Sequence, residues 1–554
     1  MIRLFSCAVL AALLAAPAQG AEPRAGSGPI SPERLSGYVR ELASDRFQGR
    51  APGTPGEDVT VRWLADQWRG LGLEPAGENG TFFQSVPLVR TQVTRADISV
   101  TAGGATRRLA QLEDVYVNTV RPQDRITADA LLVFVGYGVK APERGWDDFK
   151  GADLRGKILV FLVNDPDFEA AAGEPVAGKF GGQAMTYYGR WTYKYEEAAR
   201  QGAAGALIVH EAPGAGYGWT TVRAPGGENY DVVRDPKETP RVPFQGWLQR
   251  DRAVELFKAA GLDFEAVKGS ARTPGFKPVS LNATLKADLQ VTHERLMSRN
   301  VLAKITGRTH PQETVMVSGH WDAYGVGAPD KTGDRIRRGA ADDGVGLAGM
   351  LEIGRALKAG PAPARTVVFA AWTGEERGLL GSETYGQHPL FPNALMAANL
   401  TMDVLQLAGP SRDLSLVGYG ASSLDDLLKA ATARQGRVVI PDAHPERGLF
   451  YRADHFSLAK RGVPVLLLMG LGGGPDLVTG GKAAGDKWVS DYTAECYHQA
   501  CDRWTPQLDF RGAAQDVEAL LDMTGRLATT REWPTWAAGS EFKAERDRTA
   551  AQRR

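Results

Sequence analysis

The sequence predicts an α/β protein with a mostly parallel mixed sheet, flanked by helices, and a smaller α/β unit inserted into it. From residue 299 onward, near-continuous apolar segments alternate with segments of helical periodicity. That alternation is typical of parallel strands buried on both faces. A shorter series of apolar segments lies within 125–290, and the stretches 94–100 and 289–307 on either side look like edges of one larger domain. We therefore interpret 125–290 as an insertion.

The larger domain is expected to begin with two helices. Ser31 and Pro32 suit the N-cap and first position of a helix, and the apolar residues of 31–49 share one face. Residues 57–71 repeat this pattern, and 80–120 alternate like strands. Further on we expect strands at 300–307, 313–322, 365–376, 399–406 and 463–470, and a helix at 345–360.

The inserted unit has its own α/β order. Residues 130–138 and 156–165 are apolar and predict strands. Residues 193–211 predict a helix, a glycine turn and another strand. A unit of this kind folds as a small layered domain.

Composition excludes some classes of partner. The 554 residues include 65 Lys+Arg and 65 Asp+Glu, so the formal net charge is zero. Neither a basic excess typical of nucleic-acid binding nor a charge block typical of membrane surfaces is present. We expect a globular protein of more than one simple domain that binds no nucleic acid.

The first twenty residues resemble a secretory signal peptide. Arg3 precedes an apolar stretch at 9–16 that is too short to span a bilayer, and 18–20 resembles a small-x-small cleavage site. Cys7 precedes that stretch instead of following it, which argues against lipidation. We expect an exported protein, periplasmic or secreted, without a membrane anchor.

Five potential metal ligands occur in a suggestive order: His320, Asp342, Glu376, Asp403 and His498. Several of them lie at or just beyond the ends of predicted strands, where catalytic groups of parallel sheets gather. Histidine nitrogens and carboxylate oxygens are ligands of zinc, and two zinc ions bridged by one carboxylate can hold both an attacking water and a substrate oxygen. Glu375, directly before the third ligand, is free to act as a general base.

Each of these residues also has an ordinary structural interpretation. Asp343 caps a helix, and Glu375 with Glu376 could be an exposed acidic turn. We expect Asp322 to orient His320 and Asp502 to orient His498. His455 fits a structural role better than a place in the pocket. The ordered set, on the strand ends of one sheet, is what predicts the metal site.

Cys496 and Cys501 bracket His498. In an exported protein they could form a disulfide that stiffens the loop of this ligand, or remain two half-buried thiols. Their spacing alone does not decide between the two, because it does not fix the Cβ geometry.

At this point the motifs are recognisable. The segments GHWDAYG, GAADDGVG, WTGEERGLLGS, MDV and CYHQACD resemble the co-catalytic di-zinc aminopeptidase family, which includes bacterial leucyl-type aminopeptidases, glutamate carboxypeptidase and the transferrin receptor ectodomain. The resemblance covers roughly 30–125 and 290–530, and 125–290 looks like a protease-associated domain. The implied boundaries are a signal peptide at 1–20, the first part of the peptidase domain at 21–124, the protease-associated domain at 125–290, the main zinc peptidase domain at 291–535 and a charged tail at 536–554.

The resemblance implies how the ligands are shared. One zinc would be held by His320 and Asp403 and the other by Glu376 and His498, with Asp342 bridging both. It also implies that Glu375 is the base and that the peptide between Asp342 and Asp343 is cis. Tyr451 and Arg452 resemble a family stretch near the substrate pocket.

We expect an exported di-zinc metallo-exopeptidase that acts on peptides, most simply an aminopeptidase. Three alternatives remain open to different degrees. A carboxypeptidase would need an arginine cluster facing the substrate carboxylate, for which Arg452 is one candidate. A glutaminyl cyclase uses a single zinc, so the intact His320 and Asp403 argue against it. A binding protein could capture peptides without turnover. Oligomeric state is not predicted, and 541–554 is expected to be unstructured.

Overall fold

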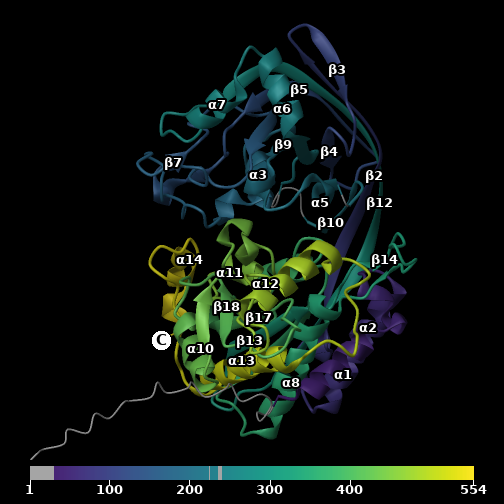
Figure 1. Ribbon diagram of the computed structural model, residues 1–554, viewed down its shortest axis with the longest axis vertical. Coiled ribbons are helices and arrows are strands. Elements are labelled where there is room, and N and C mark those ends of the chain that lie inside the picture. Colours follow the sequence, from purple (N-terminus) through teal and green to yellow (C-terminus); the bar gives the residue numbers. More distant parts are fainter. Residues whose placement is uncertain (1–29, 224, 235–239, 554) are drawn as a thin grey trace, which may run out of the picture.

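The computed structural model describes residues 30–223, 225–234 and 240–553. The chain forms two lobes, one above the other in Figure 1, joined along one side by the long strands β2 (Phe83–Ala102) and β12 (Val279–Ile305). We call residues 93–291 the upper lobe and the other described residues the lower lobe. The signal peptide predicted at 1–20 lies outside the described residues.

The two long strands carry one sheet through both lobes. They pair antiparallel from Ala283 opposite Ala102 to Val301 opposite Phe83. Because β12 also pairs with strands of each lobe, a single sheet runs in the order β19-β18-β20-β17-β13-β16-β12-β5-β8-β9-β11-β4.

The lower lobe contains the mostly parallel mixed sheet that the sequence predicts. Strand β13 lies between β16 and β17 and is parallel to both, and β17 is parallel to β20. Antiparallel pairs occur at β12–β16 and β18–β20. The strands are β13 (His310–His320), β16 (Arg365–Trp372), β17 (Met396–Met402), β18 (Asp413–Val417), β19 (Val438–Pro441) and β20 (Val465–Leu468).

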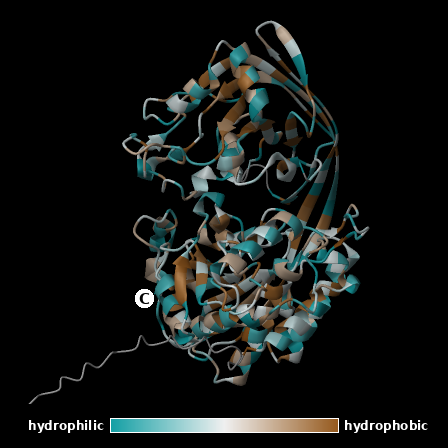
Figure 2. Ribbon diagram, viewed as in Figure 1, coloured by the Kyte–Doolittle hydropathy of each residue, from teal (hydrophilic) through white to brown (hydrophobic). Residues whose placement is uncertain are grey.

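Helices cover both faces of this sheet. Side chains of β16 alternate between two cores: Val367 and Phe369 pack with α1, α2, α8 and α13, whereas Val368 and Ala370 pack with α9 and α11. Figure 2 shows the apolar strands between these helical layers. The helices are α1 (Pro32–Leu42), α2 (Pro55–Gly70), α8 (Val345–Ala359), α9 (Leu380–Gln387), α10 (Leu424–Arg434), α11 (His455–Ala459), α12 (Gly481–Asp491) and α13 (Arg511–Thr529).

The upper lobe has its own apolar cores and its own parallel strands. Strands β5, β8, β9 and β11 are parallel neighbours, and β4 closes the edge antiparallel. The strands are β3 (Ala105–Leu109), β4 (Val115–Asn118), β5 (Arg125–Phe134), β8 (Ile158–Leu162), β9 (Gly205–His210), β10 (Glu228–Val232) and β11 (Gln245–Gln249). The helices are α3 (Trp191–Arg200), α4 (Ala212–Ala215), α5 (Trp219–Arg223), α6 (Arg250–Ala259) and α7 (Phe264–Ser270).

The lobes also contact each other away from the long strands. Strand β10 pairs with the lower part of β2, and its Tyr230 packs in a small core with Leu380. On the other side, the Met185 N–H donates to the Pro445 carbonyl at 3.1 Å, and the rings of Tyr187 and Phe456 lie 5.2 Å apart. The upper lobe is therefore held at several points.

The expectation that 541–554 is unstructured is wrong. This segment contains α14 (Lys543–Arg548) and a following 3₁₀ turn. Phe542 is 6% exposed and packs 5.0 Å from Trp536, and Arg546 is buried and donates through Nη1 to the Met396 carbonyl at 3.0 Å. The prediction failed because the many charged residues of the segment suggested a solvated tail, although Phe542 and Arg546 are buried. Within the described ranges, no helix is both long and apolar enough to cross a membrane.

Candidate metal centre

The sheet brings the five predicted ligands to one edge. His320 ends β13, Asp403 directly follows β17, and Glu376 follows β16 by a few residues. Since Ser318 lies opposite Thr401 in the parallel pair β13–β17, the residues that follow emerge side by side. Asp342 lies in the turn before α8, and His498 lies in the loop after α12.

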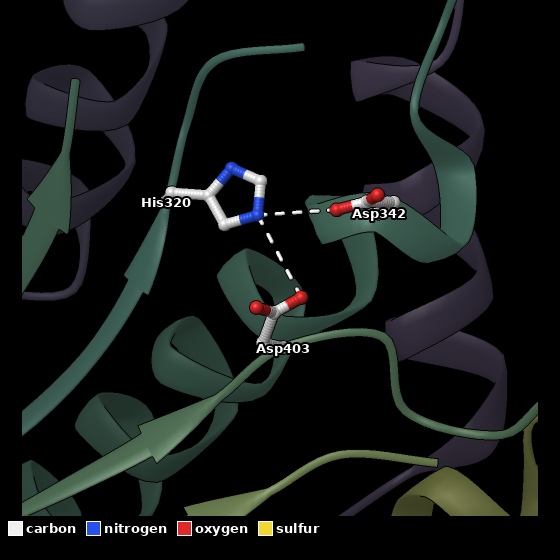
Figure 3. A group of neighbouring side chains, drawn as sticks. All are labelled: His320, Asp342 and Asp403. Atoms are coloured by element: carbon white, nitrogen blue, oxygen red, sulfur yellow. Dashed lines mark ion pairs between the residues drawn. The ribbon is translucent and has the colours of Figure 1, made fainter. Parts of the chain in front are cut away.

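These residues form two groups of three that share Asp342. His320 Nε2 lies 3.1 Å from Asp342 Oδ1 and 3.8 Å from Asp403 Oδ1 (Figure 3). His498 Nε2 lies 3.3 Å from Asp342 Oδ2 and 3.2 Å from Glu376 Oε2. Each oxygen of Asp342 thus faces a different histidine, as expected for a carboxylate that bridges two cations.

The chemistry of the site fits divalent metal ions. His320 Nε2 and Asp342 Oδ2 are buried and make no hydrogen bond, although buried polar atoms are normally paired. Burial, and next the nearby Asp342 charge, raise the pKa of Glu376 well above its usual range. So many buried carboxylates are costly unless cations neutralise them. Nitrogen and oxygen donors in small groups with room for further ligands suit zinc.

Glu375 lies beside both groups without belonging to either. Its Oε2 is 4.0 Å from His320 Nε2, and its backbone N–H donates to Asp322 Oδ1 at 3.1 Å. Burial raises the pKa of Glu375 well above its usual range, and the nearby carboxylates of Asp403 and Glu376 add to this against the opposing effect of His320. The side chain can therefore hold a proton at this position.

The predicted orienting residues act differently from what the sequence suggested. The His320 Nδ1 partner is the backbone carbonyl of Asp322, at 3.0 Å, while the carboxylate of Asp322 holds Glu375 as described. The Asp502 carboxylate does not serve His498 as expected. Its two oxygens instead accept the backbone N–H groups of Ala341 and Asp342, at 2.9 and 3.1 Å.

Asp343 links two parts of the site. One of its oxygens accepts the Gly346 N–H in the first turn of α8, which is the predicted capping contact, and the other accepts the His320 N–H at 3.2 Å. The peptide bond between Asp342 and Asp343 is cis, in agreement with the resemblance.

The loop of His498 is held by a covalent cross-link and by ring contacts. Cys496 and Cys501 form a disulfide, which resolves the alternative that the spacing left open. The ring centroids of Tyr497 and Tyr324 lie 3.6 and 4.5 Å from that of His498. An imidazole that packs against two rings and lies in a short cross-linked loop has few orientations available.

The predicted pocket residues differ in their surroundings. The Tyr451 hydroxyl donates to Glu541 at 2.8 Å, and its ring packs 5.3 Å from Phe456. Burial acts to lower the pKa of Arg452, but the nearby hydroxyls of Tyr497 and Tyr217 outweigh it and raise that pKa. His455 is fully buried, and burial lowers its pKa to about 3. That burial fits the structural role predicted for it.

Arg190 of the upper lobe was missed by sequence reasoning. It precedes α3, is 7% exposed and has a buried Nε without an acceptor. Burial, and then the charge of Arg452, lower the pKa of Arg190 to about 10. The charge of an arginine of the lower lobe therefore acts on this buried guanidinium of the upper lobe. Arg190 has no ligand-like neighbours in the sequence, so only the contact between lobes reveals it.

The profile of Peptidase family M28 matches residues 300–522, the stretch that contains all five candidate ligands. We call residues 300–522, which this profile matches, the M28 segment. This match confirms the resemblance seen in the motifs. The fold agrees as well, because the M28 segment provides most strands of the mixed sheet in the lower lobe.

Similarity to individual proteins extends beyond the M28 segment but is partial. Carboxypeptidase Q from Bos taurus is 40% identical over 269 residues, which are 48% of this chain and 44% of that protein. Carboxypeptidase Q from Xenopus laevis is 28% identical over 194 residues, 33% of this chain and 39% of that protein. The matches thus span less than half the length of either relative. A solved aminopeptidase from Aneurinibacillus sp. strain AM-1 has a TM-score of 0.51 at 18% identity, covering 91% of this chain and 96% of that chain, which shows a shared fold.

Proposed function

We propose that the protein is a zinc-dependent exopeptidase with two zinc ions per chain, and in the first place an aminopeptidase. The arrangement of Asp342 carries this proposal, since its two oxygens face His320 and His498 at 3.1 and 3.3 Å. One ion would be held by His320, Asp342 and Asp403, and the other by Asp342, Glu376 and His498.

In this proposal the two ions, when bound, supply Lewis acidity for the scissile carbonyl and lower the pKa of water. Glu375 is the general base: its carboxylate accepts the proton of the attacking water and delivers it to the leaving amine. Asp322 keeps Glu375 in place through the backbone N–H. Asp343 and Asp502 fix the backbones of His320 and Asp342, so that the ligands are ordered before substrate arrives.

A carboxypeptidase is the second candidate, and a specific observation favours it. The charge of Arg452 lowers the pKa of Arg190, and the buried Nε of Arg190 has no acceptor among the described residues. Guanidinium groups bind carboxylates through pairs of hydrogen bonds, so this pair suits the free C-terminus of a peptide. The curated relatives described above are named Carboxypeptidase Q, which is consistent with this choice.

Further parts of the proposal rest on the sequence. Residues 1–20 would direct export, and 125–290 would be a protease-associated domain inserted into the peptidase domain. The upper-lobe core also includes residues before 125, such as Val100 and Val117, so the unit that folds together would begin near 93.

A substrate panel with elemental zinc analysis on the same sample tests the proposal. The panel contains aminoacyl-p-nitroanilides, N-acetylated dipeptides and C-terminally blocked dipeptides. Cleavage of free-amine substrates only, with about two zinc ions per chain, would establish an aminopeptidase. Release of C-terminal residues from acetylated peptides would establish the carboxypeptidase.

Substitution of Arg190 and Arg452 distinguishes further between the aminopeptidase and the carboxypeptidase. Arg190→Gln and Arg452→Gln should raise KM for substrates with a free carboxylate and leave the anilides unaffected if the pair binds a C-terminus. Arg548→Gln, on the exposed face of the tail, is the matched control. If the protein binds peptides after its metal has been chelated and cleaves no substrate of the panel, it would instead be a binding protein.

A further inference from the structure

Arg50 is a fully buried arginine far from the metal ligands in the sequence. It follows α1 in the segment 45–50 and has a φ of 53°. Its exposed fraction is 0%. Its guanidinium donates only to backbone carbonyls: Nε to Trp321 at 2.7 Å, Nη2 to Gly339 at 2.9 Å, and Nη1 to Leu42 at 3.2 Å and to Arg338.

Three of the four accepting carbonyls belong to the two loops that carry ligands, and the fourth, that of Leu42, ends α1. Trp321 directly follows His320 at the end of β13. Gly339 begins the turn that contains Asp342. The backbone of Arg50 joins the same contact, because its carbonyl accepts the Ala323 N–H at 3.3 Å. One side chain from the start of the chain therefore fixes the spacing between the loops of His320 and Asp342.

Carboxylates of the site act on the charge of Arg50. Burial lowers its pKa, and the carboxylates of Asp502 and Asp343 oppose that effect. In the described part of the chain no carboxylate pairs with Arg50 within 4.0 Å, so its N–H groups remain committed to the loops. A lysine cannot replace this arrangement, since an ammonium lacks the planar fork that reaches several carbonyls in fixed directions.

We propose that Arg50 is a positioning residue of the metal centre: it sets the distance between the loops that carry His320 and Asp342. This inference rests on the proposed zinc site. It predicts that loss of the guanidinium weakens zinc binding beyond its effect on folding. Contacts that orient metal ligands from behind typically contribute a factor of about 10 to 100 in metal affinity.

The test compares zinc affinity in Arg50→Lys and Arg50→Gln with a matched control, Arg365→Lys. Arg365 is also fully buried and donates through Nη1 to two backbone carbonyls, those of Leu527 and Glu532, but neither adjoins a ligand. Zinc affinity is measured by competition with a chelating dye, and the unfolding temperature of each apoprotein is measured in parallel.

Both Arg50 variants should bind zinc about 10 to 100 times more weakly than wild type. Arg365→Lys should lower the unfolding temperature without changing zinc affinity. Wild-type affinity in the Arg50 variants, or an equal loss in Arg365→Lys, would overturn the inference. If an Arg50 variant folds only with zinc, the rate of zinc release into excess chelator provides the same comparison.

The readout does not depend on turnover. A wild-type protein that binds zinc but cleaves nothing would refute the proposed function and leave the role of Arg50 intact. A wild-type protein that binds no zinc would refute both, and this would be evident before any variant is compared.

Discussion

Replacing Glu375 by glutamine should separate catalysis from metal binding. The carboxylate belongs to neither group of three ligands, and its nearest ligand nitrogen, His320 Nε2, is 4.0 Å from Oε2. Glutamine keeps the size of the side chain and the backbone hydrogen bond to Asp322. The variant should therefore retain both zinc ions while losing the proton acceptor.

The expected loss in kcat follows from this role. General base catalysis contributes a factor of about 10² to 10⁴, which corresponds to roughly 3 to 5 kcal/mol of transition-state stabilisation. Because burial raises the pKa of Glu375, its ionised form is costly in the metal-free protein. The neutral variant should thus unfold at an equal or higher temperature than wild type when zinc is absent.

The assay pairs kcat on the best substrate with elemental zinc analysis. Glu376→Gln is the control, because Glu376 Oε2 lies 3.2 Å from His498 Nε2 in one group of three and its loss should reduce zinc content. The reasoning fails if Glu375→Gln loses zinc as Glu376→Gln does, or if it retains the kcat of wild type.

Three further predictions concern stability. Chelation of zinc should lower the unfolding temperature, because zinc at about 1,000 times its Kd stabilises the folded state by about 4 kcal/mol. Calorimetry before chelation, after it and with zinc added back measures this change. An unchanged unfolding temperature would contradict the prediction. Burial raises the pKa of Asp148 from 3.8 to about 7. Its protonated carboxyl therefore stabilises the folded state fully below pH 3.8, and this stabilisation is lost as the pH rises through 7. That loss amounts to about 4 kcal/mol at most. Urea unfolding at pH 4 and pH 7 should show a smaller decline in the free energy of unfolding for Asp148→Asn than for wild type. Equal declines in the two proteins would show that Asp148 is not a source of this pH dependence. Arg546→Ala should lower the free energy of unfolding by about 1 to 3 kcal/mol, because the hydrogen bond to the Met396 carbonyl is lost. Arg548→Ala, on the exposed face of α14, should change it little. Equally small effects of both variants in denaturant titrations would show that the Arg546 hydrogen bond adds no stability.

The proximity of the five candidate ligands could be predicted because several of them lie at or just beyond the ends of apolar strands. His320 and Asp403 end apolar strands, where an unpaired polar group is conspicuous. Parallel strands then bring such ends together without any knowledge of the loops. The sheet itself followed from the same apolar segments, which is why its mixed, mostly parallel character could be predicted as well.

The contacts around the ligands could not be predicted in this way. Sequence distance suggested that Asp502 serves His498, but its carboxylate binds the backbone of Asp342. Arg50 lies in a segment with no metal-like pattern, and only the packing of distant elements brings it against the ligand loops. The tail was misjudged because its charge hides Phe542 and Arg546, whose burial depends on the lower-lobe surface.

The ladder between β2 and β12 also constrains how the chain acquires its structure. Residues 83–102 are synthesised long before their partners at 283–301, so the edge of β2 that β12 covers stays unpaired for a time. Pairing between such distant segments is slow, and exposed edges invite association with other chains. A nascent chain therefore passes through a stage at which the residues between β2 and β12 can already fold, while β2 is not yet paired with β12. Chaperones that bind extended segments would have their clearest target there.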